Sequence, residues 1–173
     1  MDSSTLYSRV RLSPGRRLAS PVRVSLAPQF GGMVDGAWWP RDACLARELV
    51  DLIEALRQPL GAITDITLNW PSTEGTPNLD STRFAYPINK TEPQDVHLHV
   101  IALVGRHASA NLLIVPCLTT SPLAVMVLRR AAKMAISDTQ QATETYRVAD
   151  YIVRTAGAER AMCNAMALQR SSQ

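Results

Sequence analysis

The sequence predicts an α+β domain: an antiparallel sheet of about four to six strands, two main helices on one face, and a C-terminal helical extension. Segments with alternating polar and apolar residues are joined by short turns, and two longer segments repeat apolar residues at helical spacing. Their order favours antiparallel pairing of successive strands. We expect a basic N-terminal arm at residues 1–21, the core domain at 22–136 and the helical extension at 137–173.

The core is expected to begin with a strand, a loop and a helix. Val22, Val24 and Leu26 alternate with polar residues and predict the first strand. A loop follows, and Asp42 is expected to cap a helix that stops before Pro59. The apolar face of this helix consists of Leu45, Leu49, Leu52, Ile53 and Leu56.

Four further strands are expected in the middle of the chain. Residues 65–70 alternate and predict a strand with one buried face, and a weak strand is expected at 84–88. A five-residue loop joins segments 96–104 and 111–115, which predicts an antiparallel hairpin. The apolar density of 112–115 indicates a central strand covered on both faces.

Helices are predicted for most of the remaining chain. Ser121 and Pro122 are typical of a helix start, and this helix is expected to run through Ile136. A candidate capping box at residues 137–140 opens a second helix, which Gly157 is expected to end before a shorter helical piece. These C-terminal helices offer side chains suited to a partner or to self-association, or to packing on the chain's own sheet: Tyr146, Ile152, Met162 and Met166.

Positive charge is concentrated at the N-terminus. Residues 1–23 carry a net charge of +4 and the rest of the chain −1, which together give the +3 of the whole. This arm could contact phosphates, which predicts non-specific binding to nucleic acid, or it could be a solvated tail. The arginines concerned are Arg9, Arg11, Arg16 and Arg17. No helix-turn-helix, zinc-finger or ribonucleoprotein motif accompanies them, so sequence-specific reading is not expected.

Two adjacent tryptophans, Trp38 and Trp39, form the most distinctive feature of the chain. Neighbouring side chains on an extended segment point to opposite sides, so we expect one indole beneath the leucine-rich helix and the other against the sheet edge. The alternative is that an outward indole and Arg41 contact a partner. Trp38, Trp39 and Arg41 are therefore candidate binding residues, together with the arginines of the arm.

His97 and His99 form the one metal-like pattern. Two residues apart on a strand, they share a face with Asp95 and could supply two ligands to zinc or iron. The opposite face already supplies the core, so solvated histidines are the favoured interpretation. Cys117 follows a strand end, but no triad, elbow or phosphate-binding loop surrounds it. We expect no catalytic residue and no cofactor.

The cysteines and apolar runs bear on location. Three widely spaced cysteines without a Cys-x-x-Cys motif are typical of reduced thiols in the cytoplasm. No apolar run approaches the roughly 18 residues needed to cross a bilayer, and the N-terminus lacks the apolar region of a signal peptide. We expect a cytoplasmic protein without a membrane partner.

Residues 22–136 resemble an uncharacterised actinobacterial family that is catalogued only as a domain of unknown function, with many members in mycobacteria. The resemblance rests mainly on the string DGAWWPR at residues 35–41, with Val24-Ser25-Leu26-Ala27-Pro28 before it and Leu112-Leu113-Ile114-Val115-Pro116 after the leucine-rich helix. It implies lineage and a cytoplasmic setting, and it brings no activity, cofactor or catalytic residue. The helical extension departs from the short, alanine-rich endings of the family.

The leading functional expectation is a non-catalytic cytoplasmic module that contacts a macromolecular partner. The tryptophan loop, the arginine arm and the C-terminal helices are its candidate surfaces. The alternative is a small-molecule or metal site between the tryptophan loop and the sheet face of His97 and His99.

Overall fold

A computed structural model describes residues 21–69 and 98–171. Several sequence predictions lie outside these residues: the arginines Arg9, Arg11, Arg16 and Arg17 of the arm, the strand at 84–88, and His97 with Asp95.

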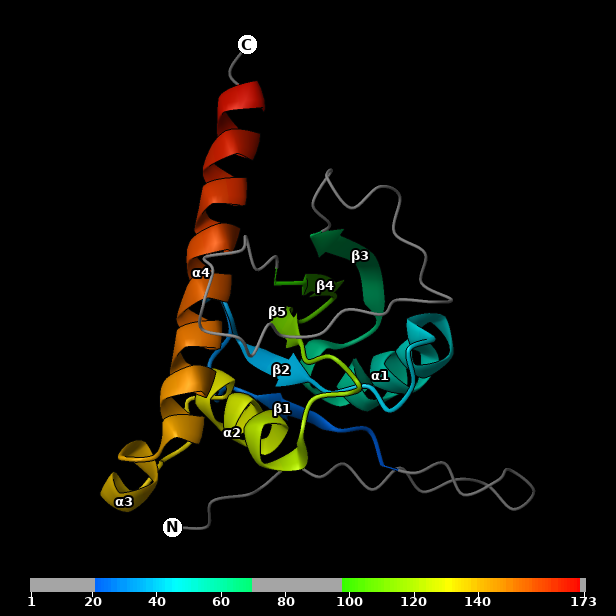
Figure 1. Cartoon of the computed structure of the whole chain (residues 1–173). Coiled ribbons are helices and arrows are strands. Elements are labelled where there is room, and N and C mark those ends of the chain that lie inside the picture. Colours follow the sequence, from blue (N-terminus) through cyan, green and yellow to red (C-terminus); the bar gives the residue numbers. More distant parts are fainter. Residues whose placement is uncertain (1–20, 70–97, 172–173) are drawn as a thin grey trace, which may run out of the picture.

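The structure confirms an α+β fold built on a five-stranded sheet (Figure 1). The strands lie in the order β1-β2-β5-β4-β3, and every neighbouring pair is antiparallel except β2 and β5, which are parallel. Their bounds are β1 Val24–Leu26, β2 Gly36–Trp38, β3 Ile63–Asn69, β4 Val100–Gly105 and β5 Ser109–Ile114. The sheet is therefore mixed and mostly antiparallel. The parallel pair arises from β2, which was expected to be loop.

The predicted hairpin in the second half of the sheet is confirmed. Val100 pairs with Leu113, and the antiparallel register continues to Val104 and Ser109. Only residues 106–108 separate the two strands, because Gly105 belongs to β4 and Ser109 to β5.

Four helices complete the described residues: α1 Leu45–Leu60, α2 Ser121–Ala131, α3 Asp138–Gln141 and α4 Glu144–Ser171. Helix α1 continues through Pro59, contrary to the prediction, and ends where Gly61 takes a φ of 78°. Its N-cap residue is Cys44 rather than Asp42. None of the helices in the described ranges combines the length and the apolar content that a membrane-spanning helix needs.

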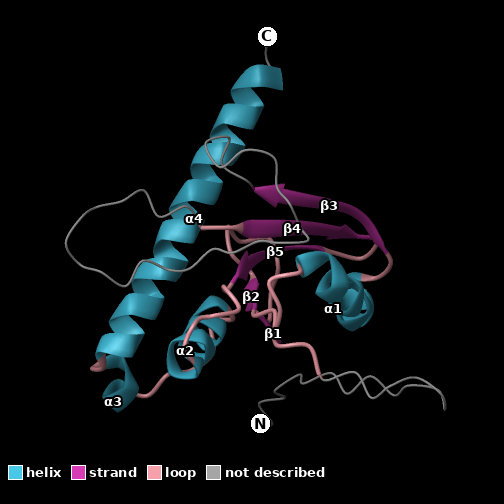
Figure 2. Cartoon of the chain, turned by 45° about the vertical axis from the view of Figure 1, so that its right-hand side comes forward, coloured by secondary structure: helices cyan, strands magenta, loops and turns pink. Residues whose placement is uncertain are grey.

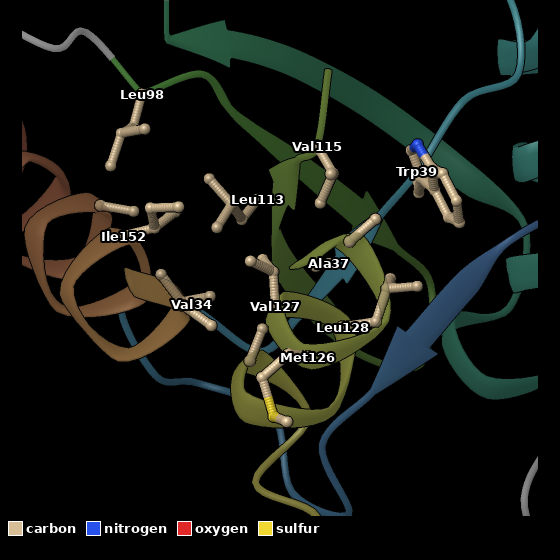
Figure 3. Close-up of a cluster of buried hydrophobic side chains, with 14 of the residues drawn as sticks. Val34, Ala37, Trp39, Leu98, Leu113, Val115, Met126, Val127, Leu128 and Ile152 are labelled. Atoms are coloured by element: carbon tan, nitrogen blue, oxygen red, sulfur yellow. The ribbon is translucent and has the colours of Figure 1, made fainter. Parts of the chain in front are cut away.

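The helices cover both faces of the sheet (Figure 2). Leu112 and Ile114 of β5 face α1, whereas Leu113 and Val115 face α2 and α4 (Figure 3). The prediction that residues 112–115 are covered on both faces is confirmed, since all four are buried. The prediction of both main helices on one face is wrong, because an apolar central strand needs a cover on each side.

Helix α4 is one continuous helix rather than two pieces. Gly157 lies inside it, and a side chain there would meet little beyond Met33. In its first half, Ala149, Ile152 and Ala156 are buried in the same cluster as α2, and Asp150 accepts a 2.7 Å hydrogen bond from Nε of Arg130. The second half extends past the sheet (Figure 1).

Candidate functional site

The DGAWWPR segment, together with Asp42, forms a turn that we call the tryptophan corner, residues 35–42. It begins at Asp35, whose side chain is fully buried. One carboxylate oxygen accepts the backbone N–H of Gly32 at 2.7 Å, and the other accepts that of Asn111 at 3.0 Å. The N–H of Asp35 in turn donates to the carbonyl oxygen of Asn111 at 2.7 Å. Asp35 therefore ties the loop before β2 to β5.

Glycine is required at position 36 because the backbones of β1 and β2 approach each other closely there. It pairs with Leu26 of β1, and a Cβ atom at this position would collide with the carbonyl oxygen of Ser25. Only glycine lets β1 and β2 pair at this distance.

The two indoles lie on opposite faces of the sheet, as their adjacency predicts. Trp38 is 1% exposed and packs in the cluster of α1 with Leu45 and Leu52. Trp39 is 8% exposed and belongs to the cluster of α2 with Leu123 (Figure 3). Since the sheet separates them, the two rings cannot line one cavity.

Arg23 covers Trp39. Its guanidinium carbon lies 3.6 Å from the ring centroid, Nε donates to the carbonyl oxygen of Trp39 at 3.0 Å, and Nη2 donates to that of Pro40 at 2.6 Å. Burial, followed by the nearby cation of Arg41, lowers the pKa of Arg23 from its ordinary value. From the sequence, Arg23 was expected to be a polar residue of the first strand and part of the basic N-terminus, and no contact with Trp39 was predicted. The available signal was its position in the first strand, where its carbonyl oxygen accepts the N–H of Trp39.

Arg41 is exposed, but its hydrogen bonds also stabilise the tryptophan corner. Its Nη2 donates to the carbonyl oxygen of Pro21 at 2.7 Å. The backbone N–H groups of Arg41 and Asp42 both donate to Oε1 of Glu48, at 2.7 and 2.6 Å, so a carboxylate in the first turn of α1 holds the entry to the helix. The corner thus behaves as a structural joint. A contact between Arg41 and a partner stays a prediction.

His99 is not on a solvated face. It is 2% exposed, and it shares the α1 side of the sheet with Ile101 two residues later. The expectation of a solvated histidine is wrong for His99, because its side chain is buried. Within residues 21–69 and 98–171, no group of three or more His, Cys, Asp or Glu could hold a metal ion. Cys117 is half-buried just beyond β5.

The second half of α4 has its polar and apolar sides reversed relative to an ordinary surface helix. Polar side chains lie toward the body: Oε2 of Glu159 accepts the N–H of Leu98 at 3.2 Å, and Nδ2 of Asn164 lies 3.8 Å from Sδ of Met33. Apolar side chains lie in solvent, with Met162 61%, Met166 55% and Leu168 71% exposed. We call this surface the outer face of α4; it consists of Ala158, Ala161, Met162, Ala165, Met166 and Leu168.

The structure separates the four C-terminal residues that the sequence grouped. Ile152 is buried and Tyr146 is half-buried, and both pack in the cluster of α2. Met162 and Met166 do not join that cluster. Met162 follows Ile152 by ten residues, roughly 80° short of three full turns of the helix, so the two side chains point in different directions.

No curated protein matches this chain, and no solved structure matches it either. The sequence model of one family, described as a family of unknown function (DUF5994), matches residues 23–131. The match includes the tryptophan corner and α2 and ends before α4. Because it covers more than half of the chain, the protein belongs to this family.

Proposed function

We propose that this member of the DUF5994 family is a non-catalytic, cytoplasmic interaction module that contacts a macromolecular partner through the outer face of α4. One observation carries the proposal: at the exposed end of α4, Glu159 and Asn164 contact the body, whereas the large apolar side chains lie in solvent. A helix that only packed on its own domain would turn its apolar side chains to the body and its polar side chains to solvent.

The composition of this segment supports a contact surface. No charged residue occurs between Arg160 and Arg170, and three large apolar side chains project from this stretch. Single exposed apolar residues are common on protein surfaces, but a contiguous group marks an interaction site. Burial of what Met162, Met166 and Leu168 now expose would contribute on the order of 1 to 2 kcal/mol each.

The tryptophan corner has less support as the contact surface. Both indoles are buried, and Arg23 and Arg41 donate to carbonyl oxygens of their own chain. We propose that the DGAWWPR string is typical of the family and of an actinobacterial lineage because it builds this joint. Non-specific contact of the arm arginines with nucleic acid remains a further proposal.

The test compares three forms of the protein as bait in extract of the native cytoplasm. Wild type, the double variant Met162→Glu/Met166→Glu and the control Val50→Glu are immobilised, and captured proteins are identified by mass spectrometry at low and high salt. Val50 is 67% exposed on α1 and so is matched for solvent exposure. We expect binders, including copies of the chain itself, to be lost from the double variant only. Equal capture by all three forms contradicts the proposal.

The alternative function is a metal or small-molecule site that uses His97 and His99. Burial of His99, which is 2% exposed, is the observation that favours it, because a buried imidazole usually has a structural or a binding role. Elemental analysis of the purified protein tests this alternative. A stoichiometric transition metal that is lost in His99→Ala would support it, and metal-free protein would remove its metal form.

A further inference from the structure

We infer that the occupant of the outer face of α4 is the α4 helix of a second copy of this chain, paired in parallel about a two-fold axis. This inference rests on the proposed function and names its partner. The contact would be a short two-stranded coiled coil flanked by the two sheets.

The spacing of exposed and half-buried residues along α4 is the first observation that supports the pairing. Exposed and half-buried positions recur at alternating intervals of four and three residues, which is the spacing of a coiled-coil seam. The seam consists of Tyr151, Thr155, Ala158, Met162, Ala165 and Gln169. It is about 27 Å long at 1.5 Å per residue. Alanines at two of the positions allow the helices to approach closely.

The seam is self-complementary. In a parallel pair about a two-fold axis, each seam residue meets its own copy, so a charged residue there would face a like charge. None of the six positions carries a charge, although Arg147, Asp150, Arg154 and Glu159 surround them on the same helix.

Charges beside the seam also match a parallel pair. Arg154 precedes Glu159 by five residues, and this is the interval at which flanking positions of two parallel helices meet. Glu159 would meet the partner's Arg154 with the same carboxylate that accepts the N–H of Leu98. The side chain of Arg154 is 77% exposed, and its ion pair with Asp150 is long, at 3.8 Å. In an antiparallel pair centred on the seam, Arg154 would instead face the uncharged end of the partner helix.

In the part of the chain that the structure describes, residues 21–69 and 98–171, the body lies on the other side of α4 from the seam. Ala149 and Ala156, which pack on α2, lie roughly 120° to 180° around the helix from Ala158 and Met162. Figures 1 and 2 show α4 along one side of the molecule, with the sheet and α2 on the other side of the helix axis. Two copies can therefore place their helices together with the bodies outside.

Cysteine cross-linking of the full chain tests the parallel arrangement. Tyr151→Cys and Met162→Cys are 11 residues apart, or about 16 Å along the helix. A disulfide needs Cα atoms within about 7 Å, so both variants form a covalent dimer only if the helices are parallel and in register. Val50→Cys, on α1, is the exposed control and should remain monomeric under the same oxidation. An antiparallel pair would cross-link one α4 variant at most and would overturn the inference.

Sedimentation equilibrium tests the pairing itself. We expect a concentration-dependent dimer of the wild type that Met162→Glu/Met166→Glu abolishes and Val50→Glu preserves. Arg154→Glu should weaken dimerisation by about 3- to 10-fold because it places like charges together, whereas Arg147→Glu should change it less. A wild type that remains monomeric overturns the inference. If the double variant then still loses protein partners from extract, the proposed function stands with a different occupant.

Discussion

Replacement of Asp35 by alanine should lower the free energy of unfolding by about 2 to 6 kcal/mol, since each N–H left without its acceptor costs about 1 to 3 kcal/mol. Two such groups are affected, those of Gly32 and Asn111, which donate to Asp35 at 2.7 and 3.0 Å. The carboxylate is fully buried, and the two residues that donate to it are half-buried.

Asparagine provides the matched control at this position. Asp35→Asn keeps the size of the side chain and one acceptor oxygen, so it can retain one of the two hydrogen bonds. Its cost should lie between those of wild type and alanine, at about 1 to 3 kcal/mol.

Urea denaturation followed by tryptophan fluorescence measures both variants. For domains with a total stability of about 5 to 15 kcal/mol, a loss of this size shifts the midpoint clearly while the slope stays constant. The reasoning is refuted if Asp35→Ala costs less than about 1 kcal/mol, or if the asparagine variant is less stable than the alanine variant.

Three further substitutions test other parts of the structure. Gly36→Ala should prevent folding, as judged by circular dichroism, because its Cβ would collide with the backbone of Ser25; a cooperative thermal transition like that of wild type would contradict this. Gly157→Ala should stabilise the protein by about 0.5 to 1 kcal/mol in urea, because the site in α4 is open and alanine favours helix; a loss would show that the helix bends there. Arg23→Met keeps an aliphatic cover on Trp39 but removes two donors to carbonyl oxygens, and should cost about 1 to 3 kcal/mol by the same assay. An unchanged free energy of unfolding would mean that those hydrogen bonds contribute nothing to stability.

Alternation and helical spacing were sufficient for most elements of the fold. The sequence predicted α1, β3 and the β4–β5 hairpin because each extends over several residues of regular pattern. It missed β2, which has only three residues, and Gly-Ala-Trp shows no alternation. The parallel partner of β2 lies some 75 residues further along the chain, so local sequence holds no signal for this pairing.

Helix ends were less predictable. Proline and glycine are poor helix residues, but their cost is small enough for tertiary contacts to outweigh it. Pro59 remains in the last turn of α1, next to the fully buried Leu60. Gly157 lies between two segments of α4 that both contact the body, at Ala156 and at Glu159.

The surroundings of the candidate site residues depend on which faces of the sheet the helices cover, and this was only partly predictable. Opposite orientations of Trp38 and Trp39 followed from their adjacency, and the structure confirms them. The environment of His99 did not follow, because the location of α1 on that face is decided by the whole packing. The reversed polarity of α4 could not be predicted either, because the order of polar and apolar residues along the helix does not show which side faces the body.

Concentration-dependent oxidation of the methionines shows whether the outer face of α4 is a contact surface. The extent of oxidation of Met162 and Met166, on the outer face of α4, is compared with that of a control, Met134, which lies just after α2 and is 38% exposed. Peptide mass spectrometry after brief peroxide treatment should show Met162 and Met166 becoming protected as protein concentration rises, with Met134 unchanged. Equal oxidation of all three at every concentration, and after addition of cytoplasmic extract, would contradict a role for α4 in recognition.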